Sequence, residues 1–75
     1  MELRYTKHAI IEMYRQGLLI SKVEEAIVTG ERKLESKRQK KYRAMKRYGN
    51  EVYHVIFRLV NHDVLLVINC KKVRL

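Results

Sequence analysis

The chain of 75 residues contains no proline, three glycines and one cysteine. Because proline is absent, no predicted strand is interrupted by a residue that lacks a backbone N–H donor. The lone thiol of Cys70 excludes an internal disulfide framework and a metal site made of several thiolates from one chain. Its ordinary role is that of a small apolar core side chain.

Long apolar runs are also absent. No segment approaches the roughly 20 apolar residues that span a bilayer, and the opening residues MELRYTKHAIIEMYRQG are charged throughout, unlike a signal peptide. We therefore expect a protein of the reducing cytoplasm with no membrane partner. The length suits one domain. A chain of this size buries only about 60% of its unfolded surface, which favours a partner subunit or a binding protein.

Acidic residues are scarce in the second half of the chain. Residues 1–35 contain six Lys or Arg and six Glu, which sum to zero. The net charge of +9 therefore lies in residues 36–75, where eleven basic residues face only Glu51 and Asp63. Such asymmetry suggests a polyphosphate chain or an acidic protein as a partner. The alternative is that the charge serves only solubility.

Residues 6–16 are predicted to form the first of two short helices. Thr6 can cap this helix by accepting from an N–H group of the first turn. Gly17 stands where a left-handed C-terminal cap is favoured. The apolar residues of the helix have a spacing that gathers them on one face: Ala9, Ile10, Met13 and Tyr14.

Residues 22–29 are predicted to form the second helix. Ser21 and Glu24 have the spacing of a capping box, and Gly30 ends the helix. Its buried stripe consists of Val23, Ala26 and Ile27. Isolated helices shorter than about 12–15 residues are marginal in water, so both helices are expected to lie on a sheet.

The remainder predicts that sheet, with strands over residues 32–36, 41–48, 51–60 and 64–72. Gly49 and Asn50 form a pair that closes tight hairpins, and residues 61–63 form a second turn. The expected fold class is α+β: two short N-terminal helices packed on one face of a small antiparallel sheet of three or four strands, in a single domain over residues 1–75.

A two-residue turn at Gly49 and Asn50 makes the numbers of cross-strand partners sum to 99, and partners share a face. The face expected beneath the helices then carries Tyr42, Ala44, Tyr48, Tyr53, Val55, Phe57 and Leu59. The opposite face carries Lys41, Arg43, Met45, Arg47, Val52, His54, Ile56 and Arg58. If Asn61 and His62 close the next turn, the covered face gains Val64, Leu66, Ile68 and Cys70. The uncovered face gains Leu65, Val67, Asn69 and Lys71.

Two long segments, RYTKHAIIEMYRQGLLISKVEEAIVTGE and YGNEVYHVIFRLVNHDVLLVINC, resemble the domain-of-unknown-function 4258 family. The motifs that carry the resemblance are Tyr5-Thr6-Lys7-His8-Ala9, Arg15-Gln16-Gly17, Val23-Glu24-Glu25 with Gly30, His54-Val55-Ile56, and Val67-Ile68-Asn69, where Asn69 replaces an expected Thr. The family is similar in architecture to the RelE/ParE toxin superfamily. The resemblance implies a ribosome-associated mRNA endonuclease, or a relative that has lost or changed that role.

Cleaving RNA without a metal requires a base for the ribose 2′-hydroxyl, cations for the phosphate and an acid for the leaving oxygen. His54 suits the base or the acid, because its ordinary pKa of about 6.5 allows either role. Arg43 and Arg58 would lower this pKa and donate to phosphate oxygens. The cations expected to hold flanking phosphates are Lys41, Arg47, Lys71, Lys37, Arg38 and Lys40. A second acid is not evident.

Other interpretations remain open. His54 could be a half-buried histidine bonded to Asn69 across the sheet, and His8 is expected to pair with Glu12. The histidines and acids have no recognised metal-ligand spacing, and no phosphate loop or cofactor motif is present, so neither a metal nor a cofactor is expected. Instead of an endoribonuclease, the chain could be a binding module for RNA, DNA or an acidic protein. The apolar floor of the uncovered face would also suit an acidic antitoxin or a homodimer.

Overall fold

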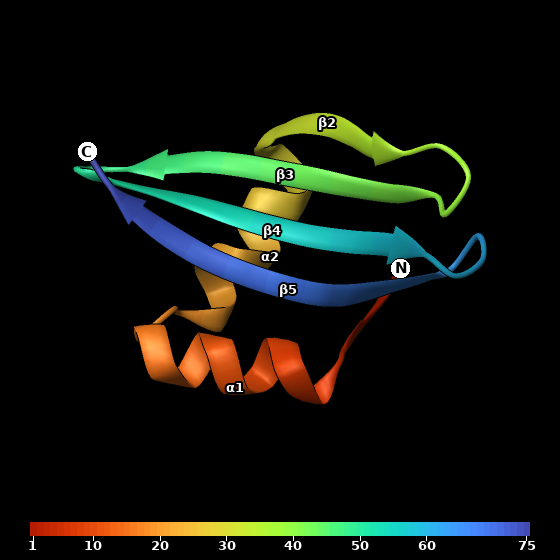
Figure 1. Ribbon diagram of the computed structural model, residues 1–75, viewed down its shortest axis with the longest axis horizontal. Helices are drawn as coiled ribbons and strands as arrows, with labels where there is room; N and C mark the ends of the chain where they lie inside the picture. The colour runs from red at the N-terminus through yellow and green to blue at the C-terminus, as the bar shows by residue number, and fades with distance from the viewer.

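The computed structural model describes residues 1–75 and has two layers, a twisted sheet and two helices behind it (Figure 1). The elements are β1 (Glu2–Tyr5), α1 (Lys7–Gln16), α2 (Ile20–Thr29), β2 (Glu31–Ser36), β3 (Lys41–Tyr48), β4 (Glu51–Leu59) and β5 (Val64–Arg74). The strand order is β1-β5-β4-β3-β2. The α+β class is confirmed. The sheet, however, has five strands and is mixed, where three or four antiparallel strands were expected.

The additional strand is β1, which pairs in parallel with β5 from Glu2↔Val64 to Tyr5↔Val67. A parallel pair is joined by a long crossover and leaves no hairpin signature in the sequence. With only four residues, β1 also lacks a long alternating pattern. Leu3 and Tyr5 pack against the core.

The caps of α1 are as predicted. The hydroxyl of Thr6 accepts from the N–H of Ala9 at 3.0 Å, and Gly17 closes the helix at φ 65°. The expected apolar stripe is only half correct. Ala9 and Met13 are buried, but Ile10 is 55% exposed and Tyr14 is 91% exposed. The reason is that α1 lies along β5 and turns only a narrow stripe toward it.

The start of α2 differs from the prediction. The N-cap is Leu19, which has no side-chain cap bond, so the expected capping box of Ser21 and Glu24 does not form. The carbonyl of Leu19 accepts from Lys22 and Val23, each at 3.0 Å, and this places Ser21 inside the first turn. The predicted stripe of Val23, Ala26 and Ile27 is confirmed as fully buried.

The hairpin register is confirmed. Tyr42 pairs with Phe57, Ala44 with Val55 and Lys46 with Tyr53. The predicted second turn is one residue too short. Asn61 Oδ1 accepts from the N–H groups of Asp63 and Val64, and this lengthens the loop.

Two core positions on β5 therefore change places with their neighbours. Leu65 and Val67 are buried, whereas Val64 and Leu66 had been expected there. An irregularity between Val67 and Asn69 adds a second residue to the shift, so Val55 pairs with Cys70. The expected alternation of faces returns from there on, and Cys70 is buried as predicted.

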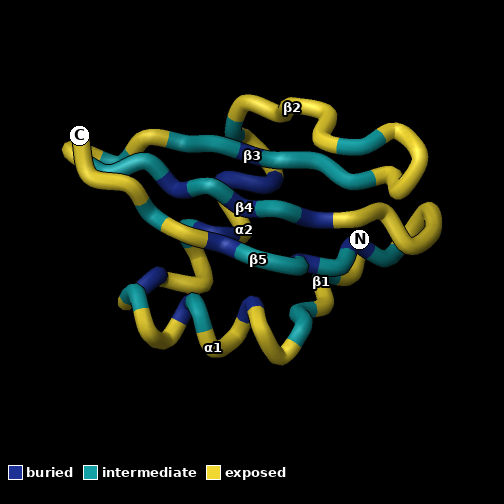
Figure 2. The backbone as a smooth tube through the Cα atoms, in the orientation of Figure 1, coloured by how far each residue is buried: buried dark blue, intermediate teal, exposed yellow.

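Buried residues alternate with half-buried ones along β4 and β5 (Figure 2), and they form a single core cluster with buried residues of both helices. Phe57 is the largest fully buried side chain. Its ring stacks on Tyr42 with centroids 5.6 Å apart, and the Arg32 guanidinium lies 5.4 Å from its centroid. Neither helix has the length and apolar character to cross a membrane.

Replacing Thr6 tests how firmly α1 is held to the sheet. Its hydroxyl caps α1 and also donates to the carbonyl of Ile68 at 3.0 Å. We expect Thr6→Ala to lower the free energy of unfolding by about 0.5–2 kcal/mol, measured by urea denaturation. Thr6→Ser retains the hydroxyl and is the control. Equal stability of the alanine and serine variants would contradict this role.

Candidate nucleic-acid interface

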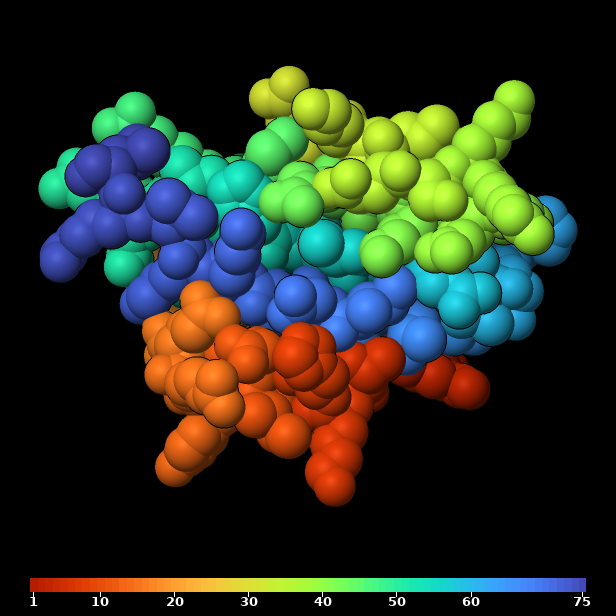
Figure 3. All heavy atoms as spheres, viewed as in Figure 1, coloured from red at the N-terminus to blue at the C-terminus, as the bar shows by residue number.

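We call the side of the sheet opposite the helices the open face. Alternate residues of β3, β4 and β5 form it (Figure 3). The strand register arranges its side chains in rows, of which two are central: Met45, His54 and Lys71 make one, and Arg43, Ile56 and Asn69 make the next. The rows bring a basic residue, an imidazole and a second basic residue from three neighbouring strands to one place.

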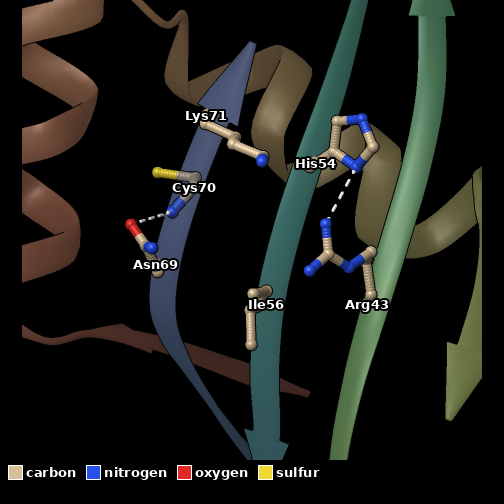
Figure 4. A pocket seen from close by; sticks show the side chains of 6 residues that line it. All are labelled: Arg43, His54, Ile56, Asn69, Cys70 and Lys71. Atoms are coloured by element: carbon tan, nitrogen blue, oxygen red, sulfur yellow. Dashed lines mark hydrogen bonds between the residues drawn. The ribbon is translucent and has the colours of Figure 1, made fainter. Parts of the chain in front are cut away.

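A hollow of about 140 Å³ lies at this place. It is lined by Arg43, His54, Ile56, Asn69, Cys70 and Lys71. Lys71 reaches from β5 toward His54 on β4, and His54 faces Arg43 on β3 (Figure 4). Arg43, His54, Asn69 and Lys71 bring polar groups to the hollow, and Ile56 and Cys70 complete its lining. Guanidinium and ammonium donors that converge in this way suit an anionic group.

Arg43 is held from two sides. Its Nη1 lies 3.2 Å from Nδ1 of His54, and its Nε forms an ion pair with the carboxylate of Glu35. Its other terminal nitrogen, Nη2, has no partner in the protein. Arg43 is therefore oriented before any ligand arrives, and it retains donors for one.

The contact with Arg43 also fixes the state of His54. A guanidinium has donors and no acceptor, so Nδ1 must accept and the proton of the neutral ring must lie on Nε2. Burial, Arg43 and Lys71, in that order, lower the pKa of His54 below its ordinary value. At neutral pH His54 is therefore an uncharged imidazole between two cations.

A titration of His54 by NMR checks this environment. We expect a pKa below about 6.5 in the folded protein, and a higher pKa in Arg43→Gln, because one repelling charge is removed. The unfolded chain binds this proton first as the pH falls. The contribution of His54 to stability is therefore lost below pH 6.5, as the pH falls toward the folded pKa. An unchanged pKa in Arg43→Gln would contradict the electrostatic coupling.

The other basic residues singled out by the sequence lie outside the hollow. Arg58 pairs with Lys41 and lies four residues from His54, about 13 Å along the strand, so it is a flanking residue here and not part of the central cluster. Arg47 lies toward the opposite end, where its Nε donates to the carbonyl of Gly49 at 2.8 Å. Three more cations occupy the β2–β3 turn: Lys37, Arg38 and Lys40.

The open alternative for His54 and the expected contact of His8 both fail to form. His54 is not bonded to Asn69, because the register sets Lys71 opposite His54, and Asn69 Oδ1 accepts from its neighbour's N–H at 2.9 Å. His8 does not pair with Glu12, whose carboxylate binds Arg15 and Gln16 instead.

Glu35 is the site residue that sequence reasoning missed. The β2 strand is irregular between Leu34 and Ser36, and this brings Glu35 beside Arg43. The ion pair lowers the pKa of Glu35, so the carboxylate is ionised at neutral pH. The only sequence signal was a single acid directly before the basic run, and no periodicity predicts the irregularity.

Cys70 lines the hollow but is not a nucleophile there. Burial, together with the carboxylate of Glu12, raises the pKa of its thiol to about 11. Its Sγ lies 3.7 Å from the carbonyl oxygen of Ala9. Cys70 is therefore a protonated core side chain at neutral pH. No three His, Cys, Asp or Glu side chains lie together in a way that could hold a metal ion.

Comparison with known proteins identifies one family. The sequence profile described as Domain of unknown function (DUF4258) matches residues 5–69. No curated protein and no solved structure matches the chain.

Proposed function

The chain belongs to the DUF4258 family of unknown function, and from the geometry of the open face we propose that it binds RNA and cleaves it without a metal. The observation that carries this proposal is the contact between Arg43 and the neutral His54 beside Lys71. We propose further that the chain is related to the RelE/ParE toxins. Two N-terminal helices on one face of a largely antiparallel sheet support that relationship.

RNA binding follows from the distribution of charge on the open face. Lys41, Arg43 and Arg47 occupy alternate positions of β3, and alternate residues of a strand are about 7 Å apart. Arg58 adds a cation from the neighbouring strand β4, and Lys71 adds one from β5, the next strand beyond it. A flexible single strand can lay successive phosphates along such a surface, and Met45, Val52 and Ile56 offer apolar contact to its bases.

The cleavage proposed here uses groups in the hollow. A phosphate that draws Arg43 to itself releases Nδ1 of His54, which can then accept the proton of the ribose 2′-hydroxyl. The 2′-oxygen bonds to phosphorus, the bond from phosphorus to the 5′-oxygen breaks, and a 2′,3′-cyclic phosphate remains. Arg43 stabilises the charge on the phosphate. Lys71 is the donor in the hollow that can protonate the leaving 5′-oxygen.

A binding module without chemistry is the second candidate. It is favoured by the resting state of His54, in which Arg43 occupies Nδ1 and the outward Nε2 carries a proton. In that state the imidazole is a hydrogen-bond donor to RNA and not a base. Either candidate acts in the cytoplasm on RNA, including ribosome-bound mRNA, and an acidic antitoxin covering the open face would inhibit it.

The test uses end-labelled single-stranded RNA in the presence of a chelator. We expect the protein to leave 2′,3′-cyclic phosphate ends. His54→Gln retains an acceptor for Arg43 but cannot act as the base, so it should bind RNA and cleave about 10²–10⁴-fold more slowly. Arg43→Ala should lose both cleavage and part of the binding. Arg15→Gln removes an exposed cation from α1 and is the matched control.

The outcomes separate the two candidates. Binding with no cleavage by the wild-type protein, of free RNA and of ribosome-bound mRNA, would reject the endoribonuclease and leave the binding module. Cleavage that His54→Gln retains would place the chemistry elsewhere. Absence of RNA binding at low salt would reject both candidates.

A further inference from the structure

A second hollow lies in the helix layer, on the side of the molecule away from the open face. Its volume is about 380 Å³. All its lining residues are apolar or aromatic: Tyr5, Ile10, Met13, Tyr14, Leu18 and Ile20. We call it the helix groove. Its lining comes from β1, α1, the link after α1 and α2, and the two helices diverge from that short link (Figure 1).

The helix groove accounts for the error in the predicted stripe of α1. Ile10 and Tyr14 follow the apolar pattern of a core face, yet they are 55% and 91% exposed. Ile20, which lines the groove from α2, is 54% exposed, and Leu19 before it is 54% exposed as well. Monomeric proteins seldom expose large apolar side chains in one contiguous patch, and such patches mark contact surfaces.

We propose that a second copy of this chain covers the helix groove, in a twofold dimer. In such a contact the same patch serves both copies, so Tyr14 of each copy can enter the groove of the other. Tyrosine is a typical anchor of protein interfaces, because it supplies a large apolar area and has few rotatable bonds to immobilise on binding. The groove is large enough to receive a ring, and Tyr14 at its edge is nearly fully exposed.

The charge distribution favours a second copy over an acidic partner. Residues 1–35 form both helices and sum to zero charge, whereas the excess of +9 lies in residues 36–75. Glu24 of α2 accepts a hydrogen bond at 3.4 Å from the hydroxyl of Tyr5, which lines the groove. Lys7 precedes Ile10, another lining residue, by one turn of α1. Two copies that meet here keep their basic open faces apart. A contact through the open faces would bring like charges together.

The apolar area around the groove also supports a dimer. A stable interface buries about 800 Å² on each partner, and one buried aromatic side chain supplies roughly 150–250 Å². Tyr14 and the neighbouring exposed aliphatic residues supply a large share of that area. Covering them would also enlarge the small core of a chain in which only 13 of 75 residues are buried.

Sedimentation equilibrium from micromolar to submillimolar concentration tests the dimer. We expect the wild-type protein to dimerise, and Tyr14→Arg to raise the dimer dissociation constant about a hundredfold, because the substitution acts twice. Tyr14→Phe should keep the dimer. Leu34→Arg is the matched control, since Leu34 is 51% exposed on the distant strand β2. Salt should strengthen the dimer by screening the net charge.

A wild-type protein that stays monomeric at all concentrations would overturn the proposal and leave the groove to a different protein. A dimer that Tyr14→Arg does not weaken would overturn it as well. Thermal melting checks that each variant is folded. RNA binding by Tyr14→Arg is measured in parallel, because the proposed function requires the open face and not the helix groove, and the two proposals can therefore fail separately.

Discussion

Phe57→Ala should be the most destabilising single truncation in this protein, lowering the free energy of unfolding by about 3–5 kcal/mol. Phe57 is fully buried, stacks on Tyr42 and lies under the guanidinium of Arg32. Truncation removes these contacts and leaves a cavity between β4 and the helices. The total free energy of unfolding of a small domain is about 5–15 kcal/mol, so this loss is a large part of it. Each kcal/mol shifts the melting temperature of such a domain by about 4–8 °C, so the variant should melt more than about 12 °C below the wild type.

Urea denaturation followed by far-UV circular dichroism measures this loss. Leu59→Ala is the matched control, because Leu59 lies two residues further on β4 and is 37% exposed. Leu59→Ala should lower the free energy of unfolding by less than about 1 kcal/mol. Similar losses in the two variants would mean that the core is not centred on Phe57.

RNA affinity should fall about a hundredfold when monovalent salt is raised from 50 mM to 200 mM. Each cation that neutralises a phosphate of a single strand contributes a slope of about −0.7 to the dependence of log K on log salt. The open face offers five such cations, which predicts a slope of about −3.5: Lys41, Arg43, Arg47, Arg58 and Lys71.

The individual contributions can be checked by fluorescence anisotropy with a labelled oligonucleotide. Arg47→Gln should reduce the steepness of the slope by about 0.7. Arg15→Gln, which alters an exposed cation of α1, should leave it unchanged. If the two variants have equal slopes, RNA does not bind along β3.

The hairpin of β3 and β4 could be predicted to the residue, because one turn dipeptide and one alternating pattern determine its register. The next turn could not. The side chain of Asn61 bonds to the backbone beyond it and adds a residue to the loop, and a one-residue shift exchanges the two faces of a strand. The irregularity near Asn69 reverses this exchange of faces, but only in the second half of β5.

The candidate site could be predicted where side chains alternate regularly between the two faces of a strand. Arg43, His54 and Lys71 were expected on the open face, and the hollow brings these three together. Arg58 was expected with them, but residues on one face of a strand are separated by fixed steps, so Arg58 lies two rows from His54 and one row from Arg43. Glu35 could not be assigned, since its position depends on an irregular strand rather than on a periodic one.

The parallel pairing of β1 with β5 has a consequence for how the chain acquires its structure. Glu2–Tyr5 has no hydrogen-bonding neighbour in the sheet until Val64–Val67 is in place. During synthesis, a nascent chain ending at β4 would therefore present Leu3, Tyr5 and the apolar side of α1 to solvent. Contacts between residues so distant in sequence slow folding. A nascent chain of this protein would thus remain sensitive to proteases and open to chaperones until its last strand leaves the ribosome.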